Sequence, residues 1–498
     1  MDYEELRQKA EELIRSGRRT EARALLMRLK GKPLPRARAS QFATLARRAG
    51  LIQLALEIMA PIVRPKTKPE KEATDEEKAT YAVILLVLGA STEALEILRT
   101  ARDSSAEVIL SLAFTHINRW DYAEAIKFLR RYLKLEGIGD YQQMIAKVNL
   151  AASYVAAGNS VSGKPLLAEI RETTHAKSWG LLHKNSLELS AQLAIQEQDW
   201  EAAKDMLARA MKATEQTASL DDFFIRKWQA IADVQMNGRE AESLRRLLAI
   251  REDAVRIGHW ETIRDCDFHR ALALRDESLA RKLYFGTPYE RFRTRLLGGA
   301  KGWLEIPASY DWQLGEGRSE RIFDLRRAEE REGISLKVGK SLHSALRALT
   351  SDFYRPLLIG SFHAAVFPGE HFNPQSSPGR LGFLVHRLRA WLRESEIPVT
   401  VAVGRDGYRL KPAGDYAFRV EPVAKAGSAV NPYDIMIEKL GRETDASLST
   451  SQIAAALGIS ERSARTFAKW ATEHGRLAKR GSGKLTRYDL PRRRRKAA

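Results

Sequence analysis

The sequence predicts a mainly α-helical protein in which a long array of helix pairs precedes two small units that combine helices and strands. Residues 1–275 are rich in Ala, Leu, Glu, Lys and Arg, which favour helices, and show almost none of the alternation expected of strands. Within this stretch a turn-and-helix phrase occurs seven times. After residue 276 aromatic residues and glycines become frequent, and short strands are expected there.

Composition and charge narrow the class of protein. The 498 residues exceed what one compact core holds, and 44% hydrophobic with 29% charged residues is typical of a folded chain. No stretch approaches the roughly 20 apolar residues of a membrane span, and the charged N-terminus is unlike a signal peptide, so we expect a cytoplasmic protein without a membrane partner. The single Cys266 excludes an internal disulfide framework and a multi-cysteine zinc site.

Positive charge is concentrated towards the C-terminus. The formal net charge is +19, and residues 340–498 carry 27 Lys and Arg against 14 Asp and Glu, a net +13. Such a segment attracts polyanions, of which nucleic acid is the commonest, followed by anionic membrane and acidic protein.

The repeated phrase combines a tight turn, a small side chain and a large apolar side chain. It begins at Gly17, Gly50, Gly89, Asn118, Gly158, Gln198 and Gly238. Five residues later stand Ala22, Ala55, Ala94, Ala123, Gly163, Ala203 and Ser243. Eight or nine residues after the turn stand Leu25, Ile58, Ile97, Ile126, Leu166, Met206 and Leu247. A stack of helix pairs needs this pattern, because a small residue lets two helices cross closely and a large one packs on the next pair.

Two occurrences, WDYAEAIKFLRRYLK and DWEAAKDMLARAMK, resemble the second helix of tetratricopeptide (TPR) repeats. The spacing of 29 to 40 residues departs from the family's regular period of about 34. The resemblance implies an N-terminal TPR-like α-solenoid over residues 1–275, whose concave groove binds a protein or peptide. The alternative is a scaffold or dimerisation arm without a ligand.

The stretch GNSVSGKP, residues 158–165, is close to the phosphate-binding signature of nucleotide hydrolases. Pro165 stands where that signature needs a Ser or Thr hydroxyl, and the preceding VNLAASYVAAG predicts a helix rather than the required strand. Gly163 occupies the small-residue position of the repeat. We therefore expect a repeat turn here. No other catalytic or metal-binding motif stands out, so we expect no enzyme activity, no cofactor and no metal.

After a connector at 276–318, residues 319–414 read as two helices, a loop, a basic helix and a hairpin around GRDG. On the basic helix an apolar stripe comprises Leu381, Leu384, Val385, Leu388 and Trp391, with Phe383, His386, Arg387, Arg389 and Arg393 on or beside the other face. The stretch HRLRAWL and the motif GYRL at 407–410 resemble the recognition helix and wing of the OmpR/PhoB-type winged-helix domain.

That resemblance implies that Arg380, Arg387 and Arg389 face the DNA groove or phosphates and that Arg405 is the wing tip. The loop PGEHFNPQSSPG is longer than expected. It would change how the helix enters the groove, or contact a partner, as the family's loop contacts RNA polymerase. The alternative is a winged helix used for protein contact only.

A linker at 415–430 leads to a second unit at 431–491. Asn431 and Pro432 open its first helix, Ser449 and Gln452 form a capping-box pattern, and Gly458 ends the next helix. The following helix has Ala464, Phe467, Ala468 and Ala471 on its apolar face and Arg462, Arg465, Thr466 and Lys469 on its polar stripe. The sequence LAKRGSGKLTRYDL predicts a hairpin with Lys479, Arg480 and Lys484 near its tip.

This second unit resembles the generic bacterial winged helix-turn-helix. The resemblance places the polar stripe in the major groove and the hairpin cations on phosphates. A solvated charged face is the alternative. Residues 492–498, with RRRRK, are expected to be a basic tail that adds phosphate affinity.

These observations predict a nucleoid-associated transcription regulator that binds double-stranded DNA through two small α+β winged-helix domains and receives a protein or peptide signal on its solenoid. RNA polymerase and a second copy of the chain are further expected partners. Two alternatives stay open. One is a scaffold whose winged helices dock proteins, and the other is a nucleic-acid-associated protein with little sequence preference.

Overall fold

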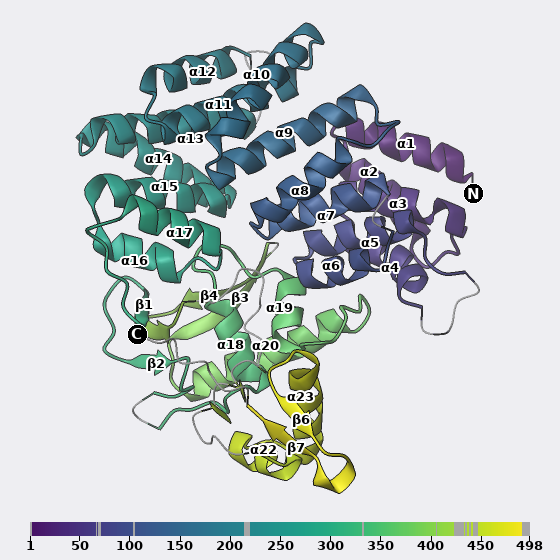
Figure 1. The fold of residues 1–498 in the computed structure, drawn as a ribbon, viewed down its shortest axis with the longest axis vertical. Coiled ribbons are helices and arrows are strands. Elements are labelled where there is room, and N and C mark those ends of the chain that lie inside the picture. Colours follow the sequence, from purple (N-terminus) through teal and green to yellow (C-terminus); the bar gives the residue numbers. More distant parts are fainter. Residues whose placement is uncertain are drawn as a thin grey trace.

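The protein is mainly helical, as the sequence predicted, with three small sheets in the part of the chain that the structure describes (Figure 1). This computed structural model describes residues 2–65, 67, 71–102, 105–213, 220–330, 333–404, 406–422, 433, 436–437, 440–441 and 447–490.

The first part of the chain consists of helices packed in successive pairs. They are α1 (Tyr3–Arg15), α2 (Arg19–Leu26), α3 (Arg36–Arg48), α4 (Ile52–Val63), α5 (Asp75–Val87), α6 (Ser91–Arg99), α7 (Ala106–Asn118), α8 (Tyr122–Tyr132), α9 (Asp140–Ala157), α10 (Ser160–Ala176), α11 (Gly180–Gln196), α12 (Trp200–Lys212), α13 (Leu220–Asn237), α14 (Ala241–Ile257), α15 (Trp260–Leu274) and α16 (Glu277–Phe285). A 3₁₀ turn spans Met27–Leu29, and a further helix, α17 (Glu290–Gly299), packs on α16. We call α1–α16 the helix-pair array.

The turn inside each pair contains one residue with positive φ. These residues are Gly17, Gly50, Gly89, Trp120, Gly158, Gln198, Gly238 and Arg275. Five residues after each turn, the chain buries Ala22, Ala55, Ala94, Ala125, Gly163, Ala203, Ser243 and Ala280. Nine residues after the first seven turns, it buries Leu26, Met59, Leu98, Leu129, Leu167, Leu207 and Leu247. The apolar contact therefore falls one residue later than most of the positions predicted from the sequence.

The fourth pair differs from the prediction at its turn. The residue with positive φ is Trp120 rather than Asn118, so the small crossing residue is Ala125, and Ala123 is exposed. The Trp120 ring stacks on Tyr289 with centroids 4.5 Å apart, and this distant contact accompanies a backbone conformation that Trp rarely adopts. An eighth pair, α15 and α16, turns at Arg275 and carries the array on to Phe285.

Gly158 and Asn159 form the turn between α9 and α10, and residues 160–165 are the beginning of α10. Gly158 ends α9 in the left-handed conformation, and the Asn159 side chain accepts a hydrogen bond from the Ser162 N–H at the start of α10. Gly163 is buried inside α10, where an added Cβ would lie 3.5 Å from a Leu193 methyl group. Because a helix precedes the turn, the strand that a phosphate-binding loop requires is absent from this position.

A unit of helices and strands follows the array, and we call residues 310–420 the α18–α20 unit. Its elements are β1 (Tyr310–Leu314), β2 (Ile322–Asp324), α18 (Ser341–Leu349), α19 (Ile359–Val366), α20 (Ser377–Glu394), β3 (Val399–Gly404), β4 (Gly407–Pro412) and β5 (Tyr416–Val420). Strands β3 and β4 form the predicted hairpin, and a bridge from Leu357 to Tyr408 joins the segment before α19 to it. On α20, Leu381, Leu384, Val385 and Leu388 are buried as expected, whereas Trp391 is only partly buried and Leu392 is buried in addition.

A separate sheet has the order β1-β5-β2, with β1 antiparallel and β2 parallel to β5. Strand β1 lies in the stretch expected to be a connector, and β5 lies in the stretch expected to be a linker. The sheet therefore brings together the two ends of the α18–α20 unit.

The second unit, residues 447–490, contains α22 (Thr450–Leu457), α23 (Glu461–Glu473), β6 (Ala478–Arg480), a 3₁₀ turn (Gly483–Leu485) and β7 (Arg487–Asp489). We call it the α22–α23 unit. The capping box of Ser449 and Gln452 is confirmed, and Gly458 ends α22 with φ 64°. Asn431, Pro432 and the tail at 492–498 lie outside the described residues.

We call α1–α8 and α9–α16 the two halves of the array. The α18–α20 unit docks against both halves, with α19 beside α6 and with β1 near α16 (Figure 1). On the N-terminal side the Gly360 N–H donates to the Leu88 carbonyl at 2.8 Å, and the Ser361 hydroxyl donates to the Gly89 carbonyl at 2.9 Å. A Cβ at position 360 would lie 2.7 Å from the Leu88 oxygen, so only glycine allows this approach. On the C-terminal side the Phe353 N–H donates to the Gly286 carbonyl at 3.0 Å.

A buried ion pair connects α15 to the segment after α18. Arg264, 1% exposed, places its Nη2 2.7 Å from both carboxylate oxygens of Asp352. Aromatic rings of Trp260, Tyr289, Phe292 and Tyr354 surround the guanidinium, with centroids 5.2 to 5.9 Å away. The Tyr354 hydroxyl also donates to Asp267 at 3.1 Å. The C-terminal contact therefore depends on a charge pair that is almost completely removed from water.

The long loop between α19 and α20 packs on the array. Phe372 is buried, and its N–H donates to the Glu93 carboxylate at 2.9 Å, while the Gln53 amide donates to the Pro374 carbonyl at 2.7 Å. The loop that was expected to meet an external partner or to redirect the basic helix thus lies against α4 and α6 of the same chain.

Burial raises the pKa of Glu93 to about 6, although the Phe372 N–H opposes this change. The other carboxylate oxygen, Oε1, has no hydrogen-bond partner among the described residues and lies 3.8 Å from Arg64 and 3.6 Å from His371. Glu96 adds a nearby like charge. Glu93, on α6 beneath the docked loop, therefore binds its proton more readily than an ordinary carboxyl group.

Replacing Glu93 by Gln should make docking of the loop less dependent on pH. The folded pKa of about 6 lies above the ordinary value of 4.5, so the stabilising contribution is complete below pH 4.5 and is lost as the pH rises through 6. Above pH 6 we expect the Glu93→Gln protein to protect the Phe372 amide from hydrogen exchange more than wild type, by up to about 2 kcal/mol. Repeating the comparison in a His371→Asn background removes the titration of the imidazole. A constant protection ratio from pH 4.5 to 7 would contradict the assignment.

Candidate nucleic-acid interface

Helix α23 presents the most coherent cationic surface of the predicted set. The Ser460 side chain accepts a hydrogen bond from the Ser463 N–H and begins the helix, while Ala464, Phe467, Ala468 and Ala471 are fully buried on its inner face. On the outer face Arg462, Arg465, Thr466 and Lys469 are all exposed. The structure therefore brings these four predicted residues together as one surface, which we call the α23 stripe.

Neighbouring acids partly balance this stripe. Arg465 lies 3.2 Å from Glu461, and Lys469 lies 3.9 Å from Glu473, in each case one helical turn away. The side chains of Arg465 and Lys469 are 71% and 78% exposed, so each pair contributes only about 0.5 kcal/mol and a phosphate can replace the acid. The Thr466 hydroxyl donates to the Arg462 carbonyl at 3.2 Å and must rotate to contact a ligand.

The hairpin β6–β7 extends the cationic surface beyond α23. Lys479 and Arg480 are exposed on β6, and Arg480 lies 2.5 Å from Asp489 on the opposite strand. The Leu448 backbone pairs with Tyr488, which attaches the hairpin to the segment before α22. Lys484 lies in the turn between the strands, and its side chain is outside the described part of the chain.

Arg487 is a further basic residue of this hairpin that the sequence interpretation missed. It lies opposite Arg480 in the strand register and donates to the Gln452 side chain at 2.9 Å. In the stretch RGSGKLTR an arginine stands on each side of the turn, and this pattern would have identified Arg487 from the sequence.

The predicted cations of α20 are exposed, but two of them have partners within the same unit. Arg380 places a guanidinium nitrogen 2.5 Å from Glu370 and lies 3.9 Å over the Phe367 ring. Arg389 donates twice to the Val401 carbonyl, at 2.9 and 2.6 Å. Both side chains are therefore engaged within the α18–α20 unit, because their partners come from a loop and a strand that helical periodicity does not reveal.

Arg387 is exposed on α20 beside an exposed aromatic ring. Its guanidinium lies 6.0 Å from the centroid of Phe383, a ring that is 66% exposed, and His386 is exposed beside it. The predicted wing-tip residue Arg405 lies outside the described residues. The α20 surface thus combines exposed arginines with an exposed aromatic ring, whereas the α23 stripe has no exposed aromatic residue among its four members.

Two observations concern metal binding and membrane insertion. Within the residues that the structure describes, no group of three or more His, Cys, Asp or Glu side chains could hold a metal ion. None of the helices in this part of the chain is long and apolar enough to cross a membrane. Comparison with known proteins finds no matching family model and no matching curated protein, so the surfaces of the chain itself carry the functional argument.

Proposed function

We propose that the protein is a DNA-binding transcription regulator whose α23 stripe enters the major groove of a duplex. The observation that carries this proposal is the exposed group Arg462, Arg465 and Lys469 on a helix that follows a capped helix and the Gly458 turn. A recognition helix needs this arrangement, because its apolar face must be held by the preceding helix while its cations reach base edges and phosphates. Lys479, Arg480 and Arg487 on the hairpin are suited to phosphate contact.

The order of elements supports a winged helix-turn-helix interpretation of both small units. In the α22–α23 unit a helix, a turn, a second helix and a hairpin follow one another. In the α18–α20 unit three helices precede a hairpin, and the Leu357 bridge supplies its third strand segment. We assign DNA reading primarily to α23, and a secondary contact to α20 through Arg387 and Phe383.

In the same proposal the helix-pair array is a TPR-like solenoid that receives a protein or peptide signal. A groove of about 720 Å³ supports this role, and it is lined by the turns of two helix pairs and by α17. Its lining has aromatic rings from Trp120 and Tyr122 and charges of both signs, with Arg119 and Arg291 matched by Asp121 and Glu290, and such mixed groups bind extended peptides. Because the loop around Phe372 is packed on the array, we assign no RNA polymerase contact to it in this arrangement.

Selection from a random duplex pool, followed by titration of the full chain at several salt concentrations, tests this proposal. We expect a preferred sequence, bound about 10³-fold or more tightly than random duplex, with affinity that falls steeply as salt rises. Equal affinity for all duplexes would favour a nucleic-acid-associated protein without sequence preference. The absence of any duplex binding at 50 mM salt would favour the scaffold alternative.

A further inference from the structure

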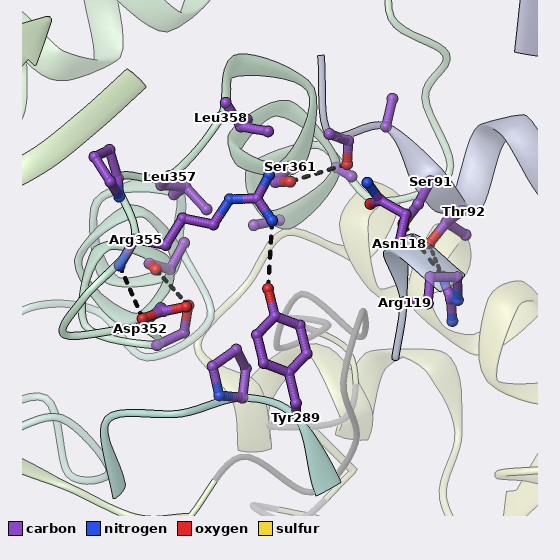
Figure 2. Close-up of a pocket in the computed structure, with 18 residues that line it drawn as sticks. Ser91, Thr92, Asn118, Arg119, Tyr289, Asp352, Arg355, Leu357, Leu358 and Ser361 are labelled. Atoms are coloured by element: carbon purple, nitrogen blue, oxygen red, sulfur yellow. Dashed lines mark hydrogen bonds between the residues drawn. The ribbon is translucent and has the colours of Figure 1, made fainter. Parts of the chain in front are cut away.

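A small cavity lies where the two halves of the array meet the α18–α20 unit (Figure 2). Its volume is about 130 Å³, and its walls come from four separate stretches of chain, within residues 89–92, 118–119, 288–289 and 348–365. The cavity adjoins the groove described above, because Arg119 lines both, but it is the one walled by the docked helices α18 and α19. An occupant would therefore contact the array, the segment before α17 and the α18–α20 unit at once.

Two arginines give the cavity its charge. In Figure 2 the Arg355 side chain extends across it towards Tyr289, and Arg119 lies on the opposite side beside Ser91 and Thr92. Arg355 donates to the Tyr289 hydroxyl at 3.3 Å, and Arg119 donates to the Thr92 hydroxyl at 3.2 Å. These partners are neutral. Among the described residues no carboxylate lies within 4.0 Å of either guanidinium, although Glu261 and Asp121 act on them from farther away.

The acid in the lining does not neutralise these two cations. Asp352 accepts hydrogen bonds from the buried Arg264 and from the N–H groups of Tyr354 and Arg355. Its negative charge is therefore balanced by Arg264, which does not line the cavity. Arg119 and Arg355 therefore have no balancing acid in the cavity wall, and the start of α6 at Ser91 adds the positive end of a helix dipole.

The remaining wall is mainly apolar. Ala348, Leu357, Leu358, Ala364 and Ala365 form the side contributed by α18, α19 and the segment between them. An engineered cavity of about 150 Å³ holds benzene, so this cavity accommodates about six non-hydrogen atoms, as many as butyrate or the ring of benzoate contains. Pockets of this composition use their few polar groups to orient a ligand and their apolar wall to bury its body.

We propose that this cavity binds a small organic carboxylate, with its head group between Arg119 and Arg355 and its apolar body against Leu357, Leu358 and Ala364. Guanidinium groups bind carboxylates through charge-assisted hydrogen bonds, and the partly buried position strengthens them. Because the walls belong to the array, to the segment before α17 and to the α18–α20 unit, the bound carboxylate would hold the three parts together. This site goes beyond the proposed DNA interface and does not depend on it.

Calorimetric titration of the full chain with acetate, butyrate, benzoate and succinate tests the site, with benzamide as the neutral counterpart of benzoate and inorganic phosphate as a second anion. We expect benzoate or butyrate to bind most tightly and benzamide to bind at least about 10-fold more weakly than benzoate. Arg119→Gln and Arg355→Gln should each weaken carboxylate binding about 10-fold or more. Arg23→Gln, an exposed change on α2, should leave it unaltered.

Ala364→Leu provides a variant that keeps both arginines and fills the cavity. It should abolish carboxylate binding while the melting temperature without ligand stays within a few degrees of wild type. Failure of all four carboxylates to bind below 10 mM overturns the proposal, as does benzamide binding as tightly as benzoate. Phosphate binding more tightly than every carboxylate overturns the assigned ligand class. Carboxylate binding that survives in Ala364→Leu and in both arginine variants places the ligand elsewhere.

Discussion

Simultaneous replacement of Arg462, Arg465 and Lys469 by Ala is expected to weaken duplex DNA binding at least about 100-fold at 0.15 M salt. The three side chains share one exposed face of α23, and each loses either a base contact or a phosphate contact. Each phosphate contact contributes about 0.9 to the slope of log affinity against log salt, so the slope should fall by about 2 to 3. Fluorescence anisotropy with the selected duplex at four salt concentrations measures both quantities.

A matched control removes the same charge from a distant surface. Lys9, Arg15 and Arg23 are exposed on α1 and α2, and Arg15 pairs with Glu11 at 2.9 Å across one helical turn, as Arg465 pairs with Glu461. Replacing these three by Ala should change DNA affinity by no more than about twofold. If the α23 variant binds DNA with unchanged affinity and salt slope, α23 is not the reading helix, and α20 becomes the candidate.

Breaking the Arg264–Asp352 pair is expected to destabilise the docked α18–α20 unit by about 3 to 5 kcal/mol. Arg264→Met would leave the Asp352 carboxylate without its charged partner, held by two backbone N–H groups in a site lined by aromatic rings. Hydrogen exchange at the amides of α18 and α19 measures the free energy of opening. Arg18→Ala, which breaks the exposed pair with Glu21, should cost less than about 1 kcal/mol.

A double replacement separates loss of the pair from loss of packing. Arg264→Met combined with Asp352→Leu removes both charges and leaves apolar side chains against the surrounding rings. It should recover most of the stability lost in Arg264→Met, because no buried charge is then left unpaired. If both proteins open with the same free energy, packing rather than charge pairing accounts for the contact.

Features set by local sequence were predictable. The capping box at Ser449, the left-handed Gly458 and the burial of Phe467 follow from residues within a few positions of each other, so the pattern of α22 and α23 could be inferred directly. The same is true of the helix pairs, whose turns at Gly17, Gly50 and similar positions require φ values that glycine adopts readily.

Features set by distant partners were not predictable. Arg389 is exposed on α20 and stays a predicted DNA contact, but its hydrogen bonds to the Val401 carbonyl of a strand could not be inferred from the helical pattern. Arg264 and Asp352 are 88 positions apart, and neither residue type suggests burial. The cavity between Arg119 and Arg355 is formed by four stretches of chain that come together only after the array curves around the α18–α20 unit (Figure 1).

Strands β1 and β5 place the beginning and the end of the α18–α20 unit side by side, with Tyr310 opposite Val420 at the open end of the pair. Tension that draws the array away from the α22–α23 unit therefore pulls on both residues from the same end. The hydrogen bonds of an antiparallel pair lie perpendicular to the strands. A force that separates the two strands at one end therefore breaks these bonds one after another rather than all at once. The β1–β5 pairing is thus weak against a force that pulls the two ends of the α18–α20 unit apart, and Leu314 and Tyr416 separate last.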